Sequence, residues 1–490
     1  MSKIIFDFNN LFDFNVGKEH GVTILEVNRM SKLIAQADKH LKQLIKNPVN
    51  RRNLGLEWVG LCWQDKSDVK KIQKLGAQIA ARYKNVLFLG IGGSYLGLKA
   101  AQDALAPFYY NEFKSKKQPR IYFEGNNLDP DTLSVLLKNL NPKETFVVVI
   151  SKSGETIETK VSFEIVRNWL RKSLGGKYGR NILAITDPNL GTLRKIVNEE
   201  QMKDSLSFRS LPLLPGVGGR YSELNMGLLH LAIIGVDIKS VLGGAKEMFK
   251  ICQSSSVWKN PAYMYAALHT ILYTTKDKSI AILMPFCEGL KSTADWYVQL
   301  LAESLGKKFE RRIEVGLGGV EKWYEDKKVV ANIGRTPIAC RGTNDLHSVQ
   351  QNNVEGENSK VVTFIRVEKF RSDIRLVQER NSFLSGRKFS ELIKLAQTAT
   401  EWALVKENRP NCTIVLSELS AFTWGQLIFF FEMATAFEAE LLNINAFDQP
   451  GVEGYKNYMY YRLRKPGISR EIAFDIEKNP LVKKAKFIIK

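Results

Sequence analysis

The sequence contains few of the residues that hold small disulfide-linked or zinc-binding proteins together. Cysteine occurs only five times in 490 residues, at Cys62, Cys252, Cys287, Cys340 and Cys412. These positions lie far apart, and none has the paired spacing of a zinc site or belongs to a short disulfide framework. We therefore expect reduced thiols, most of them buried.

A long uninterrupted apolar run is also missing. The most apolar segment, residues 424–442, contains the acidic residues Glu432, Glu438 and Glu440. Such a segment is typical of a buried helix rather than of a transmembrane span. The first residues carry charges inside their apolar run and have no small-residue cleavage site, so we predict no signal peptide. A cytoplasmic protein with no membrane partner is expected.

Acidic residues are outnumbered by basic ones, 51 against 71, which gives a formal net charge of +20. An excess of this size would favour nucleic-acid binding if the basic residues were clustered. They are scattered in short pieces, and no helix-turn-helix, zinc-finger or RNA-recognition pattern accompanies them. We therefore predict a solvated surface that attracts anionic substrates, and no nucleic-acid partner.

Short apolar runs alternate with longer amphipathic stretches in two parts of the chain. The first set of predicted strands covers residues 85–89, 120–123, 145–150 and 181–186, and the second lies near residues 279–284, 335–340, 361–367 and 412–416. This alternation is typical of doubly wound parallel sheets. The fold class is therefore predicted to be α/β with two such sheets.

The predicted strands divide the chain into four parts. We expect a helical N-terminal extension at residues 1–50, a first α/β domain at 51–215, a second at 216–420 and a helical C-terminal segment at 421–490. The sequence LPLLPGVGG, at residues 211–219, is rich in proline and glycine and marks the passage between the two α/β domains.

Two loops that directly follow predicted strands have the composition of an anion site. They are GIGGSYLG at residues 90–97 and SKSGET at residues 151–156. Glycines allow close approach to a phosphate, and hydroxyl groups, a lysine and free N–H groups at a helix start can bind its oxygens. A tight turn and an N-cap cluster are the structural alternatives. The first loop has neither dinucleotide glycine spacing nor a Walker lysine. Two loops on neighbouring strands favour a phosphate cradle.

Four further positions carry groups suited to proton-transfer chemistry. Arg220 follows a Gly-Gly turn and can stabilise an oxyanion. Glu303 ends the amphipathic pattern of residues 292–305 and can act as a base. His347 lies in a polar loop, and Lys456 follows a Pro-Gly turn. Each is equally typical of a solvated surface, so spacing alone leaves both alternatives open.

Taken together, these segments resemble the glucose-6-phosphate isomerase family. The motifs occur in family order as GIGGSYLG, SKSGETIET, GGRYS, ESLGK, GTNDLHS and FDQPGVEGYK. The last is the most specific of the six, and the matches extend from about Gly90 to Lys456. The resemblance implies two sugar-isomerase (SIS) type domains with the substrate between them. It also implies reversible isomerisation of glucose 6-phosphate to fructose 6-phosphate with no metal and no cofactor.

The resemblance implies a role for each matching residue. The substrate phosphate would be held by hydroxyl and ammonium groups of the two loops, namely Ser94, Ser151, Lys152, Ser153 and Thr156. Gly93 and Gln449 would make supporting contacts. Glu303 would move a proton between C2 and C1 through an enediolate, whose charge Arg220 would stabilise. His347 and Lys456 would open the sugar ring, with His347 supplied by the second subunit of a homodimer.

The chain departs from the family pattern at two places. Leu346 precedes the histidine where family members commonly have Gln, and Glu223 and Asn225 follow the Arg220 turn where apolar and Ser/Thr residues are expected. Three alternatives remain: an isomerase that also accepts mannose 6-phosphate, a non-catalytic sugar-phosphate sensor and a nucleic-acid-binding protein. The joint presence of Glu303 and His347 counts against the non-catalytic sensor. Only the net charge supports the nucleic-acid-binding protein.

Overall fold

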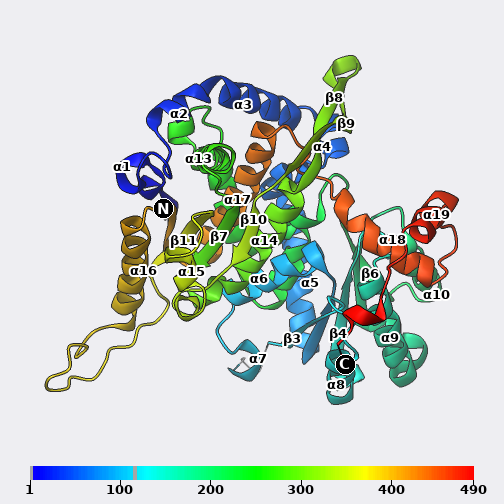
Figure 1. The fold of residues 1–490 in the computed structure, drawn as a ribbon. Coiled ribbons are helices and arrows are strands. Elements are labelled where there is room, and N and C mark those ends of the chain that lie inside the picture. The colour runs from blue at the N-terminus through cyan, green and yellow to red at the C-terminus, as the bar shows by residue number, and fades with distance from the viewer. Residues whose placement is uncertain (1–3, 114–117, 490) are drawn as a thin grey trace. The chain divides into compact units, whose positions relative to one another are not determined.

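The computed structural model describes residues 4–113 and 118–489 of the chain (Figure 1). The chain divides into two compact units, Met1–Phe447 and Asp448–Lys490, and each is considered by itself. All five cysteines are buried and free, as expected for reduced thiols.

The first sheet of the larger unit is parallel throughout. Its strands, in spatial order, are β3 (Arg120–Glu124), β2 (Asn85–Leu89), β4 (Thr145–Ile150), β5 (Ile182–Thr186) and β6 (Arg209–Pro212). The first four confirm the predicted strands. Most of their residues are buried because helices cover both faces, which is why they read as continuous apolar runs. Only β6 was missed, since its sequence RSLP is short and half-buried.

Two separate cores cover the two faces of this sheet. On one face, Val86, Phe88 and Val148 pack with the helices α5 (Lys66–Arg82), α6 (Leu96–Leu105) and α11 (Glu223–Ile233). On the other, the alternate residues Leu87, Val147 and Val149 pack with α8 (Pro130–Asn139), α9 (Ile157–Leu174) and α10 (Thr192–Lys203). Successive side chains of a strand point to opposite faces, so both cores draw on the same strands. This is the doubly wound arrangement that the sequence predicts.

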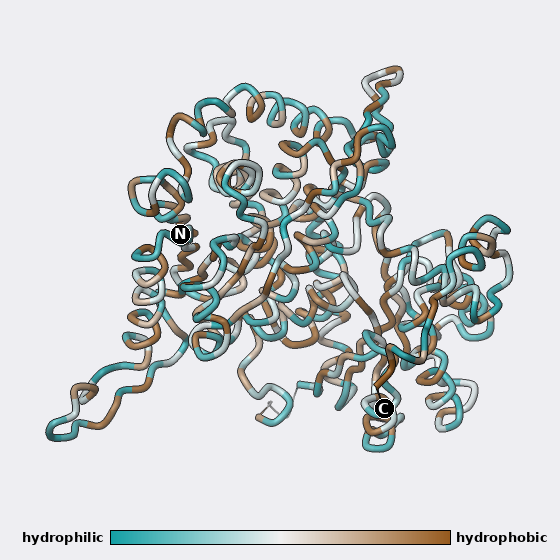
Figure 2. Tube along the Cα trace, viewed as in Figure 1, coloured by the Kyte–Doolittle hydropathy of each residue, from teal (hydrophilic) through white to brown (hydrophobic). Residues whose placement is uncertain are grey.

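The second sheet has one antiparallel edge strand. Its order is β1 (Ile4–Asp7), β12 (Asn411–Glu418), β11 (Lys360–Lys369), β7 (Ile280–Pro285) and β10 (Thr336–Ala339). The four later strands are parallel and confirm the predicted second set. The prediction that the first fifty residues are helical is wrong for Ile4–Asp7, which pairs antiparallel with β12. The apolar centres of both sheets are visible as brown segments in Figure 2.

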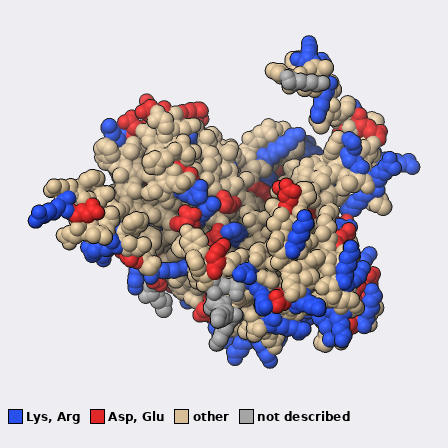
Figure 3. All heavy atoms as spheres, turned by 90° about the horizontal axis from the view of Figure 1, so that it is seen from below, with Lys and Arg blue, Asp and Glu red and all other residues tan. Residues whose placement is uncertain are grey.

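The remaining helices, which differ in length, complete the larger unit. They are α1 (Asp13–Val16), α2 (Ile24–Arg29), α3 (Ser31–Lys46), α4 (Pro48–Leu54), α7 (Tyr110–Phe113), α12 (Ile238–Ile251), α13 (Pro261–Thr275), α14 (Lys291–Leu305), α15 (Gln350–Val354), α16 (Phe389–Lys406) and α17 (Ala421–Leu441). On the face drawn in Figure 3, basic side chains are spread widely and acidic ones lie among them.

Helix α17 is the buried helix that the apolar run predicts, and two of its three acidic side chains, Glu438 and Glu440, are paired with arginines inside the core. Glu438 accepts two hydrogen bonds from Arg335, at 2.9 and 2.6 Å. Glu440 accepts two from Arg311, at 2.7 and 3.0 Å. Buried charges persist only when paired in this way. Among the described residues, no helix combines the length and apolar character that crossing a bilayer requires.

A two-stranded antiparallel hairpin, β8 (Lys307–Val315) and β9 (Glu321–Ile333), follows α14 and was not predicted. Most of its side chains are exposed, so it contains no buried apolar run. Its turn uses left-handed conformations at Gly318 and Gly319. His40 connects it to the body, since Nδ1 lies 2.6 Å from Glu440 Oε2 and Nε2 lies 3.1 Å from Glu321.

The smaller unit consists of helices, as predicted for the C-terminal segment. It contains α18 (Glu453–Arg462) and α19 (Arg470–Lys478), joined by a hydrogen bond of 2.6 Å from Tyr461 to Glu477. A short 3-10 turn, Pro450–Val452, precedes α18.

Candidate active site

Two glycine-rich loops from distant parts of the sequence are in backbone contact. Gly92–Ser94 follows β2, and Gly219–Tyr221 precedes α11. A Cβ atom on Gly93 would lie 1.9 Å from the Gly219 carbonyl oxygen, a distance that no side chain can tolerate. Gly93 therefore brings the Arg220 turn against the end of β2. This contact gives a structural reason for glycine at a position that the sequence linked to the substrate.

Arg220 is almost entirely buried, with 3% of its surface exposed, and its guanidinium is held on several sides. Nε donates to Ser304 Oγ at 2.9 Å, and Nη2 donates to the Ala446 carbonyl at 2.6 Å. Nη1 donates to Glu303 Oε2 at 3.0 Å. A guanidinium fixed by several acceptors is preorganised to face a developing negative charge.

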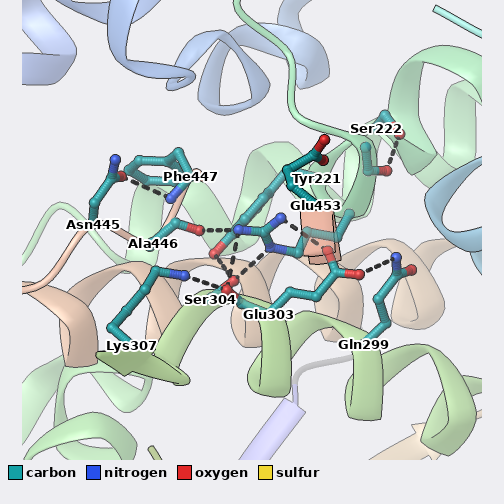
Figure 4. Close-up of polar contacts among 12 residues, drawn as sticks. Tyr221, Ser222, Gln299, Glu303, Ser304, Lys307, Asn445, Ala446, Phe447 and Glu453 are labelled. Carbon is teal, nitrogen blue, oxygen red and sulfur yellow. Dashed lines mark hydrogen bonds and ion pairs between the residues drawn. The ribbon is translucent and has the colours of Figure 1, made fainter. Parts of the chain in front are cut away.

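Glu303 lies in the last turn of α14 and keeps part of its carboxylate accessible, with 28% of the side chain exposed. Its Oε2 accepts from Arg220, and its Oε1 accepts from Gln299 Nε2 at 3.1 Å (Figure 4). The structure thus brings together two residues that the sequence predicted separately. A carboxylate held at both oxygens and reached by solvent has the geometry of a positioned base.

Three residues in this cluster were missed from the sequence. Gln299 is one helical turn before Glu303, Ser304 is the next residue, and Tyr221 follows Arg220 and lies 3.1 Å, OH to Oγ, from Ser304. The i, i+4 spacing from Gln299 to Glu303 is a signal that could have identified the first. The role of Ser304 depends on a partner 84 residues away, so no local pattern reveals it.

The SKSGET loop lies at the end of β4, which is the direct neighbour of β2 in the sheet. This pairing confirms that the two predicted anion loops follow adjacent strands. The Ser151 hydroxyl accepts from Gly154 N at 3.0 Å, and that of Ser153 accepts from Glu155 N at 3.1 Å. Gly154 has a φ of +76°, which the tight turn requires. The serines therefore shape the loop before the start of α9.

The remaining cradle residues differ in exposure. Lys152 and Ser153 are exposed, whereas Ser151 is buried. Thr156 occupies the N-cap position of α9 but makes no capping hydrogen bond through its side chain, so the capping alternative does not account for it. The Ser94 hydroxyl lies 3.8 Å from the sulfur of Met226, a weak contact.

Of the residues predicted from the sequence in the larger unit, His347 is not brought to this cluster. His347 is exposed in the short turn Asn344–His347 after β10, and no contact joins it to Glu303 within the part of the chain that the structure describes. Lys456 and Gln449 belong to the smaller unit. Lys456 Nζ lies 2.8 Å from Glu453 Oε1, and although burial lowers the lysine pKa, this carboxylate raises it above its usual value.

Glu223, where the sequence departs from the family pattern, is accommodated in the core. Glu223 is buried, accepts a 2.7 Å hydrogen bond from Trp296 Nε1 and lies beside Glu432 of α17. Gly97 makes room for it, since a Cβ there would be 2.5 Å from Glu223 Cγ. Burial raises the pKa of Glu223 to about 7, and burial together with the charge of Glu223 raises the pKa of Glu432. The other departure, Asn225, accepts a 3.2 Å hydrogen bond from Leu214 N.

Within residues 4–113 and 118–489 there is no group of three or more His, Cys, Asp or Glu side chains that could hold a metal ion. Two doubly wound sheets, glycine- and serine-rich loops after adjacent strands, and an arginine fixed on an accessible glutamate define an α/β enzyme of the sugar-isomerase class.

Comparison with known proteins identifies the family to which the chain belongs. The family model described as phosphoglucose isomerase matches residues 69–473. A glucose-6-phosphate isomerase of Carboxydothermus hydrogenoformans is 35% identical over 97% of this chain and 98% of its own length. One of Shouchella clausii is 33% identical over 98% of each chain. The chain belongs to the phosphoglucose isomerase family.

Solved structures agree on the fold. A hypothetical protein of Thermus thermophilus superimposes with a TM-score of 0.79 and 27% identity, covering 94% of this chain and 100% of that one. A glucose-6-phosphate isomerase of Chlamydia trachomatis has a TM-score of 0.74 and 21% identity, covering 94% and 90%.

Proposed function

We propose that this enzyme interconverts glucose 6-phosphate and fructose 6-phosphate in glycolysis and gluconeogenesis, by metal-independent proton transfer through an enediolate. The observation that carries the proposal is the contact of 3.0 Å between Arg220 Nη1 and Glu303 Oε2, together with the hydrogen bond from Gln299 to the other carboxylate oxygen. The family and the names of its relatives supply the substrate.

In the proposed reaction Glu303 removes the proton from C2 of the open-chain sugar and returns it to C1. The C2 proton is acidic because it is adjacent to the aldehyde carbon. As it leaves, negative charge develops on the two oxygens of the enediolate. Arg220 stabilises this charge, and its acceptors on Ser304 and Ala446 keep the guanidinium from moving away. A carboxylate base and a fixed cation suffice for this chemistry.

The substrate phosphate would bind at the loops after β2 and β4. Ser94, Ser151, Lys152, Ser153 and Thr156 supply hydroxyl and ammonium donors, and α9 begins directly after this loop. A helix N-terminus favours an anion because its first N–H groups have no intrahelical partners. The exposed Lys152 is available for charge neutralisation, and Gly93 supports the phosphate end of the site.

The remaining assignments complete the proposal. The α/β domains at residues 51–215 and 216–420 would hold the substrate between them, and the segment 421–490 would supply Lys456 and Gln449. Lys456 and His347 would open the sugar ring, with His347 coming from the second subunit of a cytoplasmic homodimer. The exposure of His347 agrees with a role toward a partner chain.

A coupled assay tests the function directly. Purified protein is incubated with fructose 6-phosphate in the presence of a chelator, and glucose 6-phosphate is detected with its dehydrogenase. Glu303→Gln should lower kcat by about 10²–10⁴-fold and leave fructose 6-phosphate binding largely intact. The matched control is Glu199→Gln, an exposed acid on α10, which should retain activity. Normal turnover of Glu303→Gln would remove it as the base, and a parallel assay with mannose 6-phosphate tests the broader specificity.

A further inference from the structure

A second group of cationic side chains gathers where three strands of the second sheet begin. Lys278 lies two residues before β7, Lys360 is the first residue of β11, and Arg409 lies two residues before β12. These strands are parallel neighbours, so their starting ends meet at one edge. His20, from the N-terminal segment, completes the group. None of the four makes a contact with Arg220 or Glu303 in the described residues.

Lys278 is buried to an extent that is unusual for a lysine, with 2% of its surface exposed. Its Nζ donates to the Asn358 carbonyl and lies 3.5 Å from His20 Nδ1. The Asn358 carbonyl is uncharged, and burial and the charge of Lys278 lower the pKa of His20. Burial, followed by the charge of Arg409, lowers the pKa of Lys278 to about 8. The buried ammonium thus has no carboxylate partner within the described chain.

Arg409 has donors with no acceptor. Its Nε and Nη1 are both buried, and neither has a hydrogen-bond partner in the described structure. Buried polar groups in native proteins are almost always satisfied, so two orphaned guanidinium nitrogens call for an acceptor. The side chain as a whole is partly exposed.

Among the described residues, no acidic side chain forms an ion pair with Lys278, Lys360 or Arg409. Glu26 is engaged by Lys276, at 2.9 Å. Glu19, Asp277 and Glu357 act on His20, Lys278 and Lys360 only through longer-range attraction, and Lys360 donates instead to the Glu357 carbonyl, at 2.7 Å. Arg409 lowers the pKa of its neighbours Lys278 and Lys360 in addition to burial. In the part of the chain that the structure describes, the N–H donors of Lys278, Lys360 and Arg409 are therefore left without a carboxylate in direct contact.

We propose that Lys278, Lys360 and Arg409 bind a small tetrahedral oxyanion, inorganic phosphate or sulfate, at a site separate from the active site. Such an ion supplies acceptors for both orphaned guanidinium nitrogens, and the planar fork of Arg409 matches two of its oxygens. The burial of Lys278 restricts the site to a small ligand. Because His20 contacts Lys278, the bound ion links the N-terminal segment to the starting ends of β7, β11 and β12.

The test is thermal unfolding of the full chain in sodium sulfate against sodium chloride at equal ionic strength, repeated with phosphate. Saturating fructose 6-phosphate is present throughout to occupy the phosphate cradle. A ligand that binds only the folded state raises its unfolding midpoint. The wild type and the control Lys70→Met, an exposed lysine of α5, should show a sulfate-specific rise. Arg409→Gln and Lys278→Met should lose it and keep isomerase activity.

Calorimetric titration with sulfate gives the affinity. Arg409→Gln should bind at least about tenfold more weakly, because it loses the charge and the fork, and Arg409→Lys should be intermediate. An unchanged sulfate response in Arg409→Gln would overturn the proposal, even if Lys278→Met fails to fold. A wild-type response that is absent with fructose 6-phosphate and present only in a parallel run without it would also overturn the proposal, because the ion would then bind only the cradle.

Discussion

Arg220 and Glu303 are 83 residues apart in sequence, and the guanidinium of the first lies 3.0 Å from the carboxylate of the second. Nε of the same guanidinium donates to Ser304 and Nη2 donates to the Ala446 carbonyl, so the arginine is held by several acceptors at once. The residues proposed as base and as electrostatic stabiliser are thus held together at the end of α14. The following predictions test this group and the core that supports it.

Replacing Arg220 by lysine keeps the charge and removes the planar fork. Lysine offers a single ammonium group, which cannot reach Ser304, Ala446 and Glu303 together. We expect kcat/KM to fall by about 10²–10³-fold, as for the loss of one preorganised oxyanion donor. Steady-state kinetics with fructose 6-phosphate measures the change. Arg180→Lys, which alters a surface ion pair with Asp204, should have wild-type kinetics, and equal kinetics in both variants would show that the fork is unimportant.

Gly93→Ala should damage both stability and activity. The new Cβ would lie 1.9 Å from the Gly219 carbonyl oxygen, so the Arg220 turn must move away from β2. Overpacking of this kind costs about 1–3 kcal/mol in the free energy of unfolding. Urea unfolding and isomerase assays measure the two effects. In Gly176→Ala, where no atom lies within 4 Å of the added Cβ, both quantities should stay within error of the wild type.

The buried carboxyls of Glu223 and Glu432 should make stability depend on pH. Burial raises the pKa of both in the folded chain, that of Glu223 to about 7, whereas both have ordinary values when unfolded. Their contribution is therefore fully present below the unfolded pKa of about 4.3 and is lost as pH rises through about 7.

Glu432→Gln removes one of the two titrating groups. Between pH 5 and pH 8 the wild type should lose unfolding free energy, and Glu432→Gln should lose less. The difference should be about 1–3 kcal/mol, because a pKa difference of one unit corresponds to about 1.36 kcal/mol. Urea unfolding at these two pH values measures the difference. Glu199→Gln, at an exposed site, should show none. If the difference in stability between Glu432→Gln and the wild type does not vary with pH, burial does not raise the pKa of these two carboxyls as proposed.

The buried pair of Arg335 and Glu438 gives a fourth test. Each side chain is 1% exposed, and the contact is bidentate. Glu438→Gln should lower the unfolding free energy by about 3–5 kcal/mol, because it leaves an uncompensated buried cation. The double replacement Arg335→Met with Glu438→Leu should recover most of this loss. Chemical unfolding of the wild type, Glu438→Gln and the double variant forms the comparison, and a double variant that is no more stable than Glu438→Gln would contradict the prediction.

The sequence was informative wherever a local property decided the structure. The runs at β2, β4 and β5 are apolar and rich in β-branched residues, so they predict buried strands whatever they pair with. Helix α17 was equally predictable, since its acidic residues exclude a membrane span. The exposed hairpin β8–β9 contains no such buried run. The edge strand β1 is only four residues long, and it forms by pairing with β12, about 400 residues later in the chain.

The motifs around Arg220 and Glu303 were visible in the sequence, and their order indicated the family. Their contact was not visible, because α14 and the Arg220 turn meet only when the sheets have formed. The same holds for Gln299 and Ser304, which look like ordinary helix residues until the guanidinium is placed against them.

The sequence by itself determined the two parallel sheets, the candidate base and the anion loops, because apolar periodicity and glycine-rich turns are local properties of the chain. Only the tertiary structure decided which polar groups meet. Gly93 against Gly219, Arg220 against Glu303, and Lys278 beside Arg409 all depend on long-range packing. Burial and convergence of charge arise from such packing, and no local pattern encodes them.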